Sequence, residues 1–61
     1  MLADQMAYLH LHYMQLDYDS RKEALELLKL WRSVKRLSQL QQLRVDKLIE
    51  KIEEVRAKRT K

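Results

Sequence analysis

Residues 2–18, LADQMAYLHLHYMQLDY, decide the fold that this sequence predicts. On a helix they form two apolar stripes on roughly opposite sides. The first stripe, spaced 4-3-4-3, consists of Leu2, Met6, Leu9, Tyr13 and Leu16. The second, spaced 4-3-4, consists of Ala7, Leu11, Met14 and Tyr18. A surface helix of a globular protein needs only one such stripe, so we expect this helix to be covered from both sides.

The second cover is expected to come from another chain, because the sequence has only 61 residues. A chain of this size buries only about 60% of its unfolded surface and usually needs additional stabilisation. Without cysteine it forms no disulfide and no thiolate metal site. We therefore predict a homodimer. The first stripe is expected to lie in the core of the chain. The second stripe is smaller and is expected to form the dimer interface: Ala7, Leu11, Met14 and Tyr18.

Composition predicts a single all-α domain over residues 1–61, a small bundle of two or three helices per chain completed by homodimerisation. Hydrophobic residues make up 46% of the chain and charged residues 36%, and neither glycine nor proline is present to break helices. No apolar run approaches the roughly 20 residues of a membrane span, so no membrane contact is expected. No secretion signal is evident at the N-terminus, and we expect a cytoplasmic location.

Capping patterns divide the chain into helices of about 2–16, 20–36 and 38–59. The polar stretch 17–20 reads as a connection, and Ser20 with Glu23 forms an S-x-x-E capping box. Ser38 with Gln41 forms a second box. The core positions expected in the second and third helices are apolar at helical spacing: Leu27, Leu28, Trp31, Val34, Val45, Leu48, Ile49, Ile52 and Val55.

One continuous helix from Ser20 to about Lys58 is the alternative, because a heptad register runs from position 24 to position 55. We favour a break near residues 36–38. Leu40 and Leu43 lie off the later apolar face, as they would just inside a buried helix start. Leu25, Leu30 and Leu37 lie off the face of the second helix and suggest wide burial there.

The sequence contains no constellation that predicts catalysis or metal binding. His10 and His12 stand at i and i+2, about 160° apart on a helix, whereas a helical zinc pair needs i and i+4. No glycine is available for a phosphate-binding loop or a nucleophile turn. We therefore expect no enzyme, no cofactor, no metal and no small-molecule substrate.

Charge is unevenly distributed, from −2 over residues 1–18 to +5 over residues 35–61. Arg44, Lys47, Lys51 and Lys58 lie within about 60° of one another on a helix. Such a row is either a solvated face or a set of phosphate contacts, which need only cations on one side.

Residues 27–50, LLKLWRSVKRLSQLQQLRVDKLIE, resemble the helical tails that follow repressor-type DNA-binding domains in bacterial and phage regulators. Leu27-Leu28-Lys29-Leu30-Trp31-Arg32 and Leu37-Ser38 match that pattern, with two extra residues before the Leu-Ser step. The resemblance implies oligomerisation or partner binding, in the context of transcription regulation, rather than base reading.

These observations together predict a non-enzymatic, protein-binding regulator that acts as a homodimer through apolar helix faces. Its further partner is expected to be another protein, which the sequence does not identify. One alternative is a nucleic-acid-binding protein that uses the basic C-terminal helix. A second is a coiled-coil element with a purely structural role.

Overall fold

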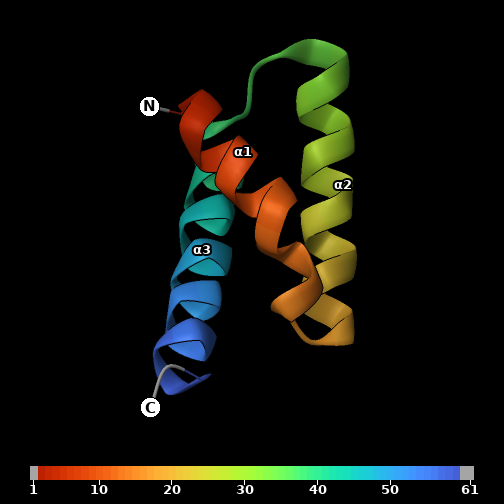
Figure 1. The fold of residues 1–61 in the computed structure, drawn as a ribbon. Helices are drawn as coiled ribbons and strands as arrows, with labels where there is room; N and C mark the ends of the chain where they lie inside the picture. Colours follow the sequence, from red (N-terminus) through yellow and green to blue (C-terminus); the bar gives the residue numbers. More distant parts are fainter. Residues whose placement is uncertain (1, 60–61) are drawn as a thin grey trace.

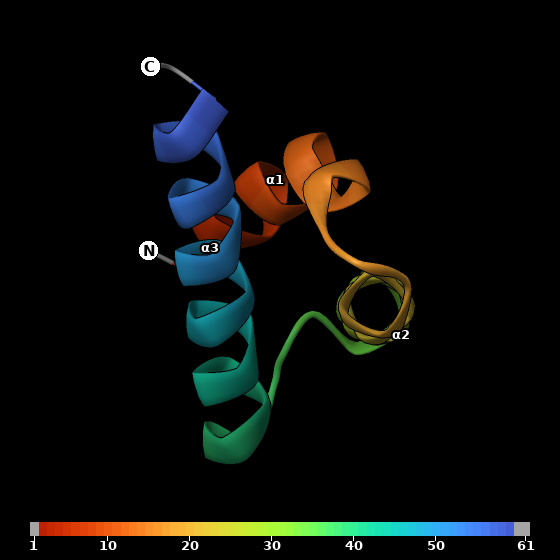
Figure 2. The ribbon, with the colours of Figure 1, turned by 90° about the horizontal axis from the view of Figure 1, so that it is seen from below.

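The computed structural model describes residues 2–59, in which every regular element is a helix and none is a strand. α1 spans Leu2–His12 and continues into a short 3-10 helix, η1, at Tyr13–Gln15. α2 spans Tyr18–Val34 and α3 spans Gln39–Arg59. α2 and α3 run in opposite directions in Figure 1. Figure 2 looks along α2 and shows α3 crossing it at a wide angle, and α1 packs against both helices. Each of the three helices contacts the other two, so the fold is a three-helix bundle.

The core lies where the three helices meet. Met6 and Leu9, from the first stripe of α1, are 2% and 0% exposed. The buried apolar side chains are Met6, Leu9, Leu16, Ala24, Leu27, Leu28, Leu37, Val45, Leu48 and Ile52. Those partly buried against them include Leu2, Tyr13, Trp31 and Ile49, and Val55 is also half-buried.

Val34 does not belong to this core, contrary to the prediction, because its side chain is 49% exposed. It is the last residue of α2, and α2 continues past the start of α3 (Figure 1). The final turn of α2 therefore has no α3 backbone opposite it.

α2 begins earlier than predicted, at Tyr18, and its N-cap is Asp17. Asp17 Oδ2 accepts a hydrogen bond of 3.4 Å from the backbone N–H of Ser20. The prediction that residues 17–20 connect the helices and that Ser20 starts α2 is wrong. An aspartate caps a helix as well as a serine does, and Asp17 takes the role three residues sooner. The first helix was predicted to end at about residue 16, but α1 ends at His12. The 3-10 turn η1 follows it and leads into the connection to α2.

The chain reverses between α2 and α3 at residues 35–38. Lys35 adopts the left-handed conformation, with φ 57° and ψ 24°, and its N–H donates to the carbonyl of Trp31. The box predicted from Ser38 and Gln41 is present. The Ser38 N–H donates to Gln41 Oε1 at 2.8 Å, and the Gln41 N–H donates to Ser38 Oγ at 3.2 Å. The alternative of one continuous helix through residues 20–58 is therefore wrong.

The start of α3 is not buried, contrary to the reason given for the break. Leu40 is 63% exposed and Leu43 is 54% exposed. α1 is tied to α3 further along, where Gln5 Nε2 donates to Asp46 Oδ1 at 2.6 Å. At 100° per residue, Leu40 and Leu43 lie about 140° and 160° around α3 from Val45, which is buried in the core.

Candidate interaction surfaces

The second apolar stripe of residues 2–18 lies on the surface of the protein. Leu11 is 74% exposed, Met14 is 64% exposed and Tyr18 is 68% exposed, and Ala7 is exposed as well. We call these four residues the outer face. The single helix predicted to carry all four is interrupted, because Ala7 and Leu11 lie in α1, Met14 in η1 and Tyr18 in α2. None of the four side chains is covered within the described part of the chain.

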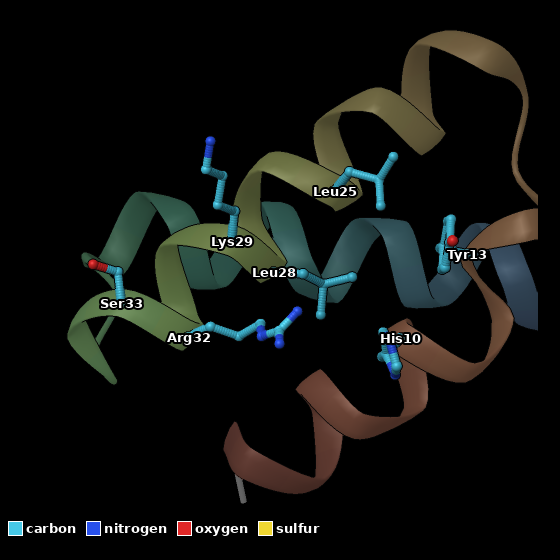
Figure 3. Close-up of a pocket in the computed structure, with 7 residues that line it drawn as sticks. All are labelled: His10, Tyr13, Leu25, Leu28, Lys29, Arg32 and Ser33. Atoms are coloured by element: carbon cyan, nitrogen blue, oxygen red, sulfur yellow. The ribbon is translucent and has the colours of Figure 1, made fainter.

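A groove of about 650 Å³ lies between α1 and α2 (Figure 3). In Figure 3, Leu25 of α2 extends towards Tyr13 of η1, whereas Lys29 and Ser33 point away from the groove. The residues that line it are His10, Tyr13, Leu25, Leu28, Lys29, Arg32 and Ser33. A neighbouring depression shares three of them and also includes Ala7, so the groove reaches the outer face at Ala7.

Leu25 is the residue of this surface that the sequence reasoning missed. It was expected to be buried, but its side chain is 46% exposed and lines the groove. Its spacing of seven from Tyr18 places both residues on the same side of α2. That spacing was the available signal.

The opposite side of α1, towards α3, is closed by polar contacts. Arg56 Nη1 lies 3.3 Å from the hydroxyl oxygen of Tyr8 and 3.4 Å from Nε2 of His12. Gln5 adds the bond to Asp46 described above. The apolar surface around α1 therefore opens towards α2 and solvent, and not towards α3.

The two histidines face different neighbours. His10 lines the α1–α2 groove, whereas His12 lies beside Arg56 and the side chain of Gln15. Over residues 2–59 no three histidine or acidic side chains are grouped so that they could hold a metal ion. The α1–α2 groove offers an apolar surface with basic edges rather than an arrangement of reactive groups.

Three of the four cations predicted as a row on α3 make contacts within the protein. Arg44 forms an ion pair with Glu23 of α2. Lys51 Nζ donates to Ser20 Oγ at 3.0 Å, and Lys58 Nζ lies 3.7 Å from Glu54 Oε1. Lys47, the fourth, is exposed. The two carboxylates reduce the positive charge of the row.

The same row borders the exposed leucines at the start of α3. Leu40 and Leu43 line a groove of about 400 Å³ together with Lys47. We call this the α3 groove; its residues are Glu23, Leu40, Leu43, Arg44, Lys47, Leu48 and Lys51. The spacing 40-43-47-51 puts leucines and lysines on one face of the helix, a pattern that the sequence reasoning had split between two arguments.

Comparison of the chain with protein-family models, curated protein sequences and solved structures finds no match. None of the helices within residues 2–59 is both long and apolar enough to cross a membrane. The outer face, the α1–α2 groove and the α3 groove are the surfaces of residues 2–59 that expose large apolar side chains.

Proposed function

We propose that the protein is a small non-enzymatic regulator that binds other proteins and acts as a homodimer through the outer face. The observation that carries this proposal is the exposure of Leu11, Met14 and Tyr18, which come from α1, η1 and the first turn of α2. The other side of α1 is buried in the core. Burial of apolar surface contributes about 25 cal/mol per Å² and favours association. A small chain also gains stability when a second copy adds to its core.

The dimer is expected to have two-fold symmetry, in which the same surface of each chain faces its counterpart. A stable interface of standard size covers about 800 Å² on each partner, more than four side chains present. The interface therefore extends from the outer face into the α1–α2 groove and includes Leu25. Aromatic and methionine side chains, here Tyr18 and Met14, are typical of the centre of such interfaces.

A pair of leucine substitutions tests this proposal. Leu11→Asp places a charge in the interface, and it is expected to make the protein monomeric in sedimentation experiments. Leu43→Asp is the matched control, because it makes the same change at an exposed leucine on α3. The control is expected to remain dimeric. If both variants dimerised equally, the outer face would not be part of the dimer interface.

A further inference from the structure

The α3 groove combines two features that rarely occur together on a solvated helix face. Leu40 and Leu43 expose large apolar side chains one turn apart, 63% and 54% respectively. Arg44, Lys47 and Lys51 follow them and line the same groove. Glu23 provides its single carboxylate and pairs with Arg44, so the groove lining keeps an excess of positive charge.

We infer that the α3 groove binds an acidic amphipathic helix of a partner protein, an inference that rests on the proposed role in protein binding. The apolar side of such a helix covers Leu40 and Leu43. Its acidic side chains pair with Lys47 and Lys51. Recognition of an amphipathic helix by an apolar groove uses anchors at i, i+3, i+4 and i+7, and the charges set its orientation.

The length of the groove fits a short helix. From position 40 to position 51 the axis of α3 rises about 16 Å, at 1.5 Å per residue. A partner helix of about 11 residues spans that distance. Lys51 already donates to Ser20, so one of its protons is used within the protein and Lys47 is the cation best placed to reach the partner.

An acidic amphipathic helix accounts for both the leucines and the lysines of the α3 groove. A nucleic-acid backbone accounts for the lysines alone. Phosphate contacts need cations alone and gain nothing from Leu40 or Leu43. Glu23 is paired with Arg44, so Lys47 and Lys51 are the cations of the groove that a partner's acidic side chains can reach. An acidic protein helix therefore uses both halves of the groove.

The test uses the full chain and a fluorescent synthetic peptide of about 15 residues, a length that spans the groove. The peptide contains Leu, Glu and Ala, with its leucines on one helical face and its glutamates beside them. Fluorescence anisotropy measures its affinity. A scrambled peptide of the same composition keeps the charge and removes the apolar face. A single-stranded oligonucleotide of equal charge tests nucleic acid directly.

Leu40→Ala with Leu43→Ala removes the apolar anchors without changing charge, and both positions are exposed. This double variant is expected to weaken binding about tenfold or more, as loss of central apolar anchors does at protein interfaces. Lys47→Glu is expected to weaken binding comparably and to flatten its salt dependence. Leu11→Asp, on the outer face, is expected to leave the affinity unchanged even where the dimer is lost. Circular dichroism checks that each variant remains helical.

Several results would overturn the inference. One is the absence of binding by the amphipathic peptide, and another is equal binding of the scrambled peptide. A third is tighter binding of the oligonucleotide than of the amphipathic peptide, with an affinity that does not change when Leu40 and Leu43 are replaced by alanine. If the Leu11→Asp variant remained helical but no longer bound the peptide, the binding site would lie on the outer face instead. Because dimerisation is measured separately, failure of the dimer and failure of this site are distinguishable.

Discussion

Lys51 of α3 donates a 3.0 Å hydrogen bond to the hydroxyl of Ser20 of α2, 31 residues earlier in the chain. Ser20 is 7% exposed, so the bond lies at the edge of the core, where the first turn of α2 meets α3. The serine thus joins two helices instead of capping one. The bond also holds one of the cations that line the α3 groove.

Ser20→Ala is expected to destabilise the protein by about 1 kcal/mol, because it removes the acceptor for the Lys51 ammonium group. Ser33→Ala is the control, since Ser33 lies on the same helix and is exposed. Both changes replace serine by alanine in an end turn of α2, so the difference between them reports the side-chain hydrogen bonds of Ser20. Urea unfolding followed by circular dichroism measures it. Equal stability of the two variants would show that the bond contributes nothing.

Lys35→Gly is expected to stabilise the protein by about 1 kcal/mol, because a glycine adopts the left-handed conformation without the steric cost of a Cβ. Lys35 is the only non-glycine residue with positive φ in the described part of the chain. Arg36→Gly serves as the control and is expected to lose stability through chain entropy. Thermal unfolding compares the three proteins. A loss of stability in Lys35→Gly contradicts the conformation assigned to this turn.

The cap at Asp17 predicts an acid-sensitive contribution to stability. A hydrogen bond from the side chain of Ser20 is the largest cause that holds the pKa of Asp17 below its ordinary value of 3.8, and the backbone N–H of Ser20 adds to it. A carboxylate with a lowered pKa in the folded state stabilises that state above the unfolded pKa. This stabilisation is lost as the pH falls through the folded pKa. We therefore expect Asp17 to stabilise the fold fully at neutral pH and to lose that effect below about pH 4.

Asp17→Asn isolates this effect, because asparagine caps a helix without titrating. The difference in stability between wild-type protein and Asp17→Asn, measured by urea unfolding, is expected to change between neutral pH and acid. A difference that stays constant across that range would show that the carboxylate does not act through its charge.

Gln15 carries the one buried side-chain oxygen that has no hydrogen-bond partner among residues 2–59, its Oε1. Its Nε2 lies 3.3 Å from Nδ1 of His12. An unpaired buried polar atom costs about 1–3 kcal/mol, and replacement by an apolar group of similar shape removes that cost. We expect Gln15→Met to stabilise the protein by up to about 1 kcal/mol. Gln39→Met, at an exposed position, should have no comparable effect; equal gains in both variants would refute the explanation.

Features set by neighbouring residues could be predicted from the sequence. The all-helical fold follows from the apolar spacing and from the absence of glycine and proline, and the turn before α3 follows from Ser38 and Gln41, which are three residues apart. The start of α2 was missed because Asp17 and Ser20 are both good caps. The local sequence does not show which of the two residues is the N-cap of α2. In the structure Ser20 is buried and accepts a hydrogen bond from Lys51, which leaves Asp17 as the cap.

Features set by the relative placement of helices could not be predicted in this way. Val34 has an apolar side chain at a core spacing, but α2 extends past α3 there. Leu40 and Leu43 lie on the side of α3 away from the buried Val45, and no other described helix covers that side. The α3 groove also depends on Glu23 of α2, which lies beside Arg44 only after the chain has reversed.

The mass of the wild-type protein in solution tests the central claim most directly. Sedimentation equilibrium over about 1 to 100 µM, a range in which mass action shifts a weak dimer, reports that mass. We predict a species of about 15 kDa, twice the 7.5 kDa of one chain, that dissociates only on dilution. A helical, cooperatively unfolding protein that stays at 7.5 kDa across the range would contradict the claim that the outer face joins two copies.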